Sequence, residues 1–297
     1  MRNWGIRLPF HTQRHLQSRK LACKDTAPFS QTPPIAPSMD TDALLLLLAT
    51  LACVGGVVHA VLALRAGSWK NSRLHWLPLT LAFLLLTGFL YLRGQANGRC
   101  PLTTMSEVLI FIGWCIVMMY LLVGPAFRLS LLGVFTAPLV AMLLVLAQVL
   151  PPTASPRPAR PIIALLELHA AVSLIAYAAF ALACVTGVMY LLQERLLKKH
   201  QISKLFYQLP PISGLARAIQ KLIWIGLLLL SAGLAISFAL KIEVSNPKII
   251  MAWIVWGLYA LVSLLMWRHV TSPRQTAWLA AAGFAIPFFS LWIVTHG

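Results

Sequence analysis

The stretch ELHAAVSLIAYAAF, residues 167–180, holds three polar side chains whose types and spacing could bind a metal. His169, Ser173 and Tyr177 follow one another at intervals of four residues, so they share one face if the segment is a helix. Imidazole nitrogens are common metal ligands, and a hydroxyl one turn away can orient the ring through its second nitrogen. We therefore take His169 as the leading candidate for a metal ligand, the alternative being a hydrogen-bonded interior histidine.

Other acidic and aromatic side chains could line a site for a flat ligand. Glu107 opens the apolar run SEVLIFIGW, and Trp114, seven residues later, shares its helical face. Trp253 and Trp256 in AWIVWG could stack on such a ligand, although packing is the alternative use of both rings. Glu167 points away from the face of His169 and suits an interfacial position, where an acid in the first turn complements the helix dipole.

The elements that must position these residues are membrane helices. The chain is 59% hydrophobic and 10% charged, with a mean hydropathy of +0.81, whereas soluble domains have about 25% charged residues. Apolar stretches of about 20 residues recur throughout, which is the length that spans a bilayer as a helix. We predict an all-α, polytopic membrane helical bundle of about eight transmembrane helices. The predicted spans are residues 43–64, 76–92, 105–127, 129–150, 162–192, 222–240, 249–267 and 277–294.

The distribution of basic residues predicts the orientation of this bundle. The net charge of +17 would suggest nucleic acid in a soluble protein, but here it fits the bias of Lys and Arg toward cytoplasmic loops, so we expect lipid and no nucleic acid as a partner. One set of alternate loops holds twelve basic residues: Arg65, Lys70, Arg73, Arg128, Arg195, Lys198, Lys199, Lys204, Arg217, Lys221, Arg268 and Arg274. The opposite loops hold six: Arg93, Arg99, Arg157, Arg160, Lys241 and Lys248. This difference places the amino and carboxyl ends of the bundle outside and the loop QERLLKKHQISK inside.

This orientation sorts the other histidines by depth. His296 and His169 fall toward the outer side, with Glu107, while His59 and His269 fall toward the cytoplasmic side. Two histidines at each face would suit a pair of bis-imidazole haem sites or a route between them. The alternatives are an interior histidine at His59 and a frayed chain end at His296.

The first 38 residues differ in composition from the bundle. They are Arg-rich, poor in acid and Pro-rich near their end, as in a transit-like segment or a disordered tail. We favour a third interpretation, in which translation starts at Met39, because MDTDALLLLLATL is a natural beginning for a chain with its amino terminus outside. We therefore divide the chain into a basic tail, residues 1–38, and a single membrane domain, residues 39–297.

Four segments, in order, resemble the cytochrome c assembly membrane proteins of the CcsA and ResC type, especially the HemX-like branch. They are MSEVLIFIGW, LHAAVSLIAYA, FYQLPPISGLARAIQKLIWIGLLLLSAGLAISF and NPKIIMAWIVWGLYA. The first is similar to that family's Glu followed by an apolar run ending in Phe-x-x-Trp, and the second to its His followed eight residues later by Tyr-Ala. The similarity extends over most of the chain from about residue 40.

The resemblance implies haem handling at the outer face of the membrane. His169 matches the family's external haem-ligand histidine, and Glu107 and Trp114 would belong to the same outer cavity. Arg93 and Arg99 could meet haem propionates, because Arg pairs well with carboxylates. His296 lies near a second external histidine of some members. We assign weaker roles to Tyr177, Trp253 and Trp256 as cofactor-contacting residues and to His59 and His269 as iron ligands.

Departures from the family pattern limit the expected activity. KIEVSNP has no Trp, Asn246 stands where Asp is expected, and Ala176 replaces the usual Ser before the Tyr. The tryptophan-rich signature is thus missing, which argues against a haem-ligating synthetase, and no catalytic constellation is visible. We expect a non-enzymatic, haem-binding protein of the bacterial cytoplasmic (inner) membrane that acts with cytochrome c maturation or haem-biosynthesis proteins. The alternatives are a small-molecule transporter and a non-haem scaffold that uses its basic cytoplasmic loop.

Overall fold

The computed structural model describes residues 39–66, 76–102, 104–126, 131–150, 164–198, 210–241 and 247–296. The predicted tail, residues 1–38, and the connection 242–246 lie outside the described residues, so the following concerns the membrane domain from residue 39 on.

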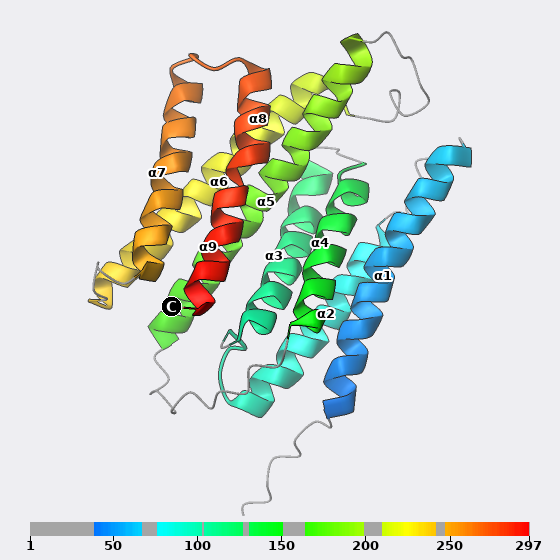
Figure 1. The fold of residues 1–297 in the computed structure, drawn as a ribbon, viewed down its shortest axis with the longest axis vertical. Coiled ribbons are helices and arrows are strands. Elements are labelled where there is room, and N and C mark those ends of the chain that lie inside the picture. Colours follow the sequence, from blue (N-terminus) through cyan, green and yellow to red (C-terminus); the bar gives the residue numbers. More distant parts are fainter. Residues whose placement is uncertain are drawn as a thin grey trace, which may run out of the picture. The chain divides into compact units, whose positions relative to one another are not determined.

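Regular structure in the described residues is entirely helical, which confirms the predicted fold class (Figure 1). The helices are α1 Met39–Ala66, α2 Leu77–Asn97, α3 Met105–Ala126, α4 Leu132–Val149, α5 Ala164–Lys198, α6 Ile212–Ala239, α7 Pro247–Trp267, α8 Pro273–Gly283 and α9 Ala285–His296. Of these described helices, seven, α1 to α7, are long and apolar enough to cross a bilayer. The chain is therefore a multi-pass membrane protein.

The eighth predicted span, residues 277–294, is wrong as a single helix. It is divided between α8 and α9, which are separated at Phe284. Pro287, in the first turn of α9, has no N–H to donate to the carbonyl of Gly283, so the helical hydrogen-bond ladder is broken there. The two pieces follow each other along the chain in Figure 1, with the carboxyl end at the finish of α9.

Two helices also extend beyond their predicted spans. α5 continues to Lys198, and α6 begins at Ile212, ten residues before the predicted start at residue 222. At a rise of 1.5 Å per residue, the 35 residues of α5 and the 28 of α6 are about 52 and 42 Å long, whereas the hydrocarbon core is about 30 Å thick. The charged end of α5 and the start of α6 therefore reach the lipid headgroup region as helix, and the connection is shorter than predicted.

α5 joins the two halves of the bundle. It contacts α3 and α4 on one side and α6 and α8 on the other, while α1 to α4 pack against each other. Small residues let its neighbours approach closely: a Cβ on Gly226 of α6 would lie 2.5 Å from the ring of Phe180. Phe180 also stacks on Tyr259 of α7, with ring centroids 3.6 Å apart. Close packing of small and aromatic residues is what holds membrane helices together, because lipid supplies no hydrophobic drive between them.

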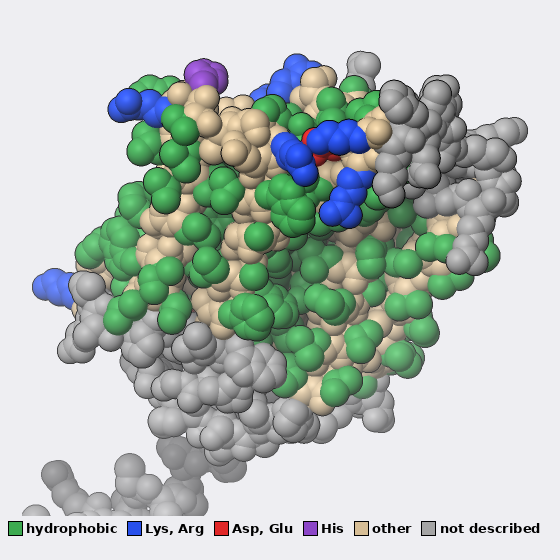
Figure 2. All heavy atoms as spheres, turned by 45° about the horizontal axis from the view of Figure 1, so that its top comes forward, with side chains coloured by type: hydrophobic (Ala, Val, Ile, Leu, Met, Phe, Trp, Pro, Cys, Tyr) green, Lys and Arg blue, Asp and Glu red, His purple; other side chains and the backbone are tan. Residues whose placement is uncertain are grey.

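Charged residues collect at the two ends of the bundle. The basic end, where α5 finishes and α6 begins, carries Arg195, Lys198, Arg217, Lys221, Arg268 and Arg274 among the described residues. The opposite end, where α3 and α5 begin, is called the acidic end here because it holds most of the described carboxylates; it carries Asp42, Glu107 and Glu167 together with Arg93, Arg99 and Lys241. Figure 2 shows Lys and Arg gathered at one end above an apolar surface. This separation is consistent with a bilayer around the apolar middle.

Candidate functional site

His169 lies at the start of α5 with its ring held against α6. Its Nδ1 is 2.7 Å from the backbone oxygen of Gly233. A carbonyl oxygen only accepts hydrogen bonds, so Nδ1 carries a proton, and in the neutral imidazole the lone pair is then on Nε2. The side chain is half-buried. This arrangement presents an oriented imidazole with a nitrogen able to bind a metal.

The group that orients His169 differs from the predicted one. Ser173 does not reach the imidazole ring; its Oγ donates to the backbone oxygen of His169, 2.8 Å away. The backbone of α6 comes close because residue 233 is glycine: a Cβ there would lie 2.5 Å from the Oγ of Ser173. The contact between Gly233 and Ser173 therefore sets the position of the carbonyl that holds His169.

We expect Gly233→Ala to destabilise the protein because the new methyl group overlaps Ser173. Overpacking of this kind costs about 1–3 kcal/mol, partly offset by the higher helix propensity of alanine. Adding Ser173→Ala should restore most of the loss, because the Cβ of residue 173 lies 3.7 Å from the new Cβ, an ordinary contact. Thermal unfolding of the two single variants and the double variant in detergent measures this coupling. Equal losses in Gly233→Ala with and without Ser173→Ala would contradict the close contact.

Tyr177 links α5 to α9 from the same face. Its hydroxyl lies 3.5 Å from the Oγ of Ser290, which itself donates to the backbone oxygen of Pro287 at 2.7 Å. Tyr177 is therefore the donor in the first bond. His296 belongs to the last turn of α9, and its side chain lies outside the described residues. The end of α9 and the start of α5 lie at the same end of the bundle (Figure 1).

Glu107 forms a buried ion-pair network with α1 and α2. The Nε of Arg93 is 3.3 Å from Oε1 of Glu107, and its Nη1 is 3.6 Å from Oδ2 of Asp42. Glu107 also closes a capping box with Thr104 at the start of α3: each residue's backbone N–H donates to the other's side chain. Arg93, predicted as a partner for propionates, is thus engaged by two carboxylates of the chain itself.

Glu167 joins the start of α5 to the connection between α2 and α3. Its Oε1 accepts a hydrogen bond from the backbone N–H of Cys100 at 3.3 Å. Burial raises the pKa of the Cys100 thiol, and the carboxylates of Glu167 and Glu107 raise that pKa further. The thiol is therefore protonated at neutral pH and is a poor nucleophile.

We expect Cys100 to react slowly with a maleimide at mildly alkaline pH, because little of the thiol is ionised. Glu167→Gln keeps the acceptor for the Cys100 N–H but removes the negative charge, so the thiol pKa should fall and the rate should rise, roughly threefold. The rate is measured as a function of pH in a chain whose other cysteines are replaced by alanine. A rate that is unchanged or lower in Glu167→Gln would show that the carboxylate does not act on the thiol.

The three tryptophans proposed as ligand-contacting residues all make contacts within the bundle. Trp114 donates from Nε1 to Oγ1 of Thr87 at 2.9 Å and stacks on Phe83, so it faces α2, as Glu107 does. Trp256 donates to Oγ of Ser231 at 2.8 Å, and Trp253 packs edge-on against it and Phe238. Since Ser231 and Gly233 are two residues apart on α6, they face opposite ways, so these rings and His169 lie on different sides of that helix.

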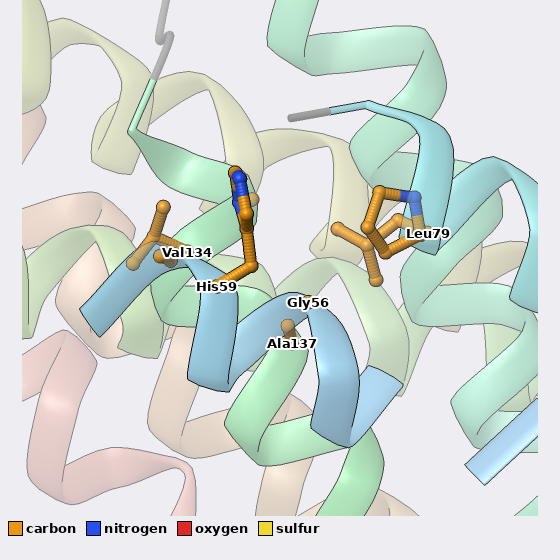
Figure 3. Close-up of a pocket in the computed structure, with 8 residues that line it drawn as sticks. Gly56, His59, Leu79, Val134 and Ala137 are labelled. Atoms are coloured by element: carbon orange, nitrogen blue, oxygen red, sulfur yellow. The ribbon is translucent and has the colours of Figure 1, made fainter. Parts of the chain in front are cut away.

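The two other histidines proposed as iron ligands lie toward the basic end. His59 lines a cavity of about 20 Å³ between α1, α2 and α4, where its ring lies near Val134 and across from Leu79 (Figure 3). That volume admits about one water molecule. His269 follows α7 and lines a second cavity, of about 190 Å³. His169 lines neither of these two cavities.

The described residues contain no group of three His, Cys, Asp or Glu placed to hold a metal ion. A metal ion bound by protein side chains alone usually takes three or four such ligands. Haem differs, because its macrocycle holds the iron and the protein supplies axial ligands such as a single histidine. The free Nε2 of His169 fits that requirement.

Two features of the site were missed in the sequence. Asp42 was not predicted to belong to the site, because it directly precedes a long apolar run and was expected to be a solvent-exposed residue at the start of a helix. The carbonyl of Gly233 has no side-chain signature, although the glycines at 226 and 233, two turns apart, do mark the face of α6 that approaches α5.

Comparison with known proteins shows one family. The family model described as Cytochrome C assembly protein matches residues 102–296, which include α3 to α9. Protein HemX of Brevibacillus brevis is 29% identical over 201 residues, covering 65% of this chain and 73% of the relative. Protein HemX of Bacillus subtilis (strain 168) is 26% identical over 194 residues, covering 62% and 70%. Cytochrome c biogenesis protein CcsA of Chlorella vulgaris is 30% identical over 119 residues, 38% of either chain.

Proposed function

Because the chain belongs to the cytochrome c assembly protein family, we propose that it acts in cytochrome c biogenesis as a membrane protein that binds haem through His169. The observation that carries this proposal is the bond from His169 Nδ1 to the carbonyl of Gly233, which leaves Nε2 as a ligand. Haem, when bound, would supply an iron centre, and His169 would hold it through Nε2.

The chain's own residues would prepare this ligand. Gly233 fixes the tautomer and the plane of the imidazole, and Ser173 holds the backbone of the same turn. Tyr177 ties this face of α5 to α9, the helix that carries His296. Orientation of this kind typically changes metal affinity 10–100-fold. His296 is the proposed second ligand.

We place the protein among accessory or regulatory factors rather than enzymes. Two of its relatives are named HemX, and the tryptophan-rich signature expected of a synthetase is missing from the sequence. The proposed location is the bacterial cytoplasmic membrane, since these two relatives are bacterial and α1 to α7 are apolar enough to span a bilayer. Proteins of cytochrome c maturation or haem biosynthesis are the proposed partners.

A deletion strain tests the proposed role. Membranes that lack the chain should contain less covalently haem-stained c-type cytochrome, while b-type cytochromes stay unchanged as the control. Expression of the full chain should restore the staining, and the His169→Ala variant, inserted at the same level, should not. Unchanged c-type cytochromes in the deletion strain would overturn the role in biogenesis. Full restoration by His169→Ala would overturn the role of His169.

A further inference from the structure

A cavity of about 190 Å³, lined by both polar and apolar side chains, opens at the basic end, between α6, the end of α7 and the start of α8. This volume is several times the space needed for one water molecule. Five of its lining side chains carry hydrogen-bond donors: Arg217, Gln220, His269, Thr271 and Thr276. It lies away from His169 and does not depend on haem.

Arg217 and Thr271 keep donors that are available to a ligand. The recorded hydrogen bond of Arg217 uses only Nε, which donates to the backbone oxygen of Ser213 at 3.4 Å, and a guanidinium has five N–H donors. Thr276 donates its hydroxyl to Thr271 at 3.3 Å and, in a shared bond, to the backbone of Ser272 at 3.2 Å. Thr271 is the acceptor in the first of these bonds, so its own proton can be donated into the cavity.

Among the described residues, those that line this cavity include no carboxylate. Glu194 is the acidic residue of the described part of the chain that lies at the basic end. It pairs with Lys198 at 2.7 Å and with Arg274 at 3.4 Å. Arg217 is not among these partners of Glu194, and Figure 2 shows Lys and Arg side chains gathered at this end of the bundle, which make its potential positive.

The imidazole of His269 is placed in the cavity wall by an unusual backbone conformation. His269 has a φ of 54°, and the hydrogen bonds His269 N to Met266 O and Val270 N to Leu265 O, both 3.1 Å, close α7 as a Schellman motif. Glycine is the usual residue at this position. At the start of α8, the backbone N–H groups of Ser272 and Gln275 are used within their own capping box. A ligand in the cavity would therefore bind mainly to side-chain donors.

The length of α6 places this cavity at the level of the lipid headgroups. The first ten residues of α6, which include Arg217 and Gln220, precede the predicted apolar span and extend beyond the hydrocarbon core. An arginine fork with imidazole, amide and hydroxyl donors suits a phosphate group, and basic pockets between membrane helices bind lipid headgroups at this depth. We propose that this cavity binds a phosphate group, carried by an anionic phospholipid or by a small soluble phosphate.

Binding is tested on the full chain in nanodiscs by its thermal midpoint. The two arms are discs of phosphatidylcholine with added inorganic phosphate, and discs of phosphatidylcholine mixed with phosphatidylglycerol. Stabilisation only in the first arm identifies a soluble phosphate, and stabilisation only in the second identifies a lipid headgroup. Either result supports the site if Arg217→Gln lowers the apparent affinity for the stabilising phosphate compound about tenfold.

Two further variants keep the test decisive. His269→Asn removes the imidazole but retains a residue that tolerates positive φ, so it should weaken binding without lowering the midpoint of the unliganded protein. Arg195→Gln, at the same end but outside the cavity lining, is the matched control and should bind as the unmodified chain does. No stabilisation in either arm, or equal loss in Arg195→Gln and Arg217→Gln, would overturn the proposal.

Discussion

Replacing His169 by alanine is expected to lower the affinity of the purified chain for hemin at least about tenfold. The imidazole is held by the carbonyl of Gly233, so its Nε2 is oriented before any ligand arrives. Removing the imidazole takes away the proposed iron ligand and leaves the Gly233 carbonyl without its hydrogen-bond donor. The measurement is a hemin titration in detergent, followed by the Soret band.

A matched variant separates ligation from nonspecific binding to the apolar bundle. His59→Ala removes an imidazole from the small cavity at the basic end and should leave the titration unchanged. His169→Gly with added imidazole should recover part of the band, because a free imidazole can replace the missing ring. Equal hemin affinities for His169→Ala, His59→Ala and the unmodified chain would show that His169 is not a ligand.

The second large effect is expected at the ion-pair network of the acidic end. Arg93→Met should destabilise the protein by about 3 kcal/mol, because it removes a cation that two buried carboxylates share. The side chains of Asp42 and Glu107 are only 9% and 5% exposed. Oδ1 of Asp42 already lacks a hydrogen-bond partner among the described residues, which makes the loss of Arg93 more costly. Thermal or denaturant unfolding in detergent measures the change.

Two comparisons test this explanation of the Arg93 effect. Arg99→Met, on the adjoining connection, should change stability by less than about 0.5 kcal/mol. Adding Asp42→Asn and Glu107→Gln to Arg93→Met should recover part of the loss, since neutral side chains are cheaper to bury than unpaired carboxylates. An Arg93→Met variant no less stable than Arg99→Met would show that the network does not support the fold.

Much of the fold could be predicted because hydropathy reports bilayer crossing directly. The helices α1 to α5 and α7 lie where the apolar runs place them, and Glu107 and Trp114 both contact α2, as their seven-residue spacing predicts. The helix ends were harder to predict, because an apolar run ends at the first charged residue whereas the helix α5 continues to Lys198. The break between α8 and α9 was not predicted, because the hydropathy of the apolar run that contains Pro287 is typical of a single membrane span.

The candidate site could be predicted only in part, because its partners come from other helices. Spacing placed His169, Ser173 and Tyr177 on one face, and the structure has them contacting α6 and α9. No pattern within α5 indicates that a backbone carbonyl orients the imidazole, since that depends on how closely α6 approaches. The pairing of Arg93 with Asp42 depends likewise on the packing of α1 against α2.

The most direct test of the central claim is the pulsed EPR spectrum of the full chain loaded with hemin and labelled with heavy nitrogen in histidine. Our account predicts coupling between the iron and histidine nitrogen, and the contribution from His169 should disappear in His169→Ala. A spectrum without histidine coupling, or one in which the coupling is unchanged in His169→Ala, would contradict it.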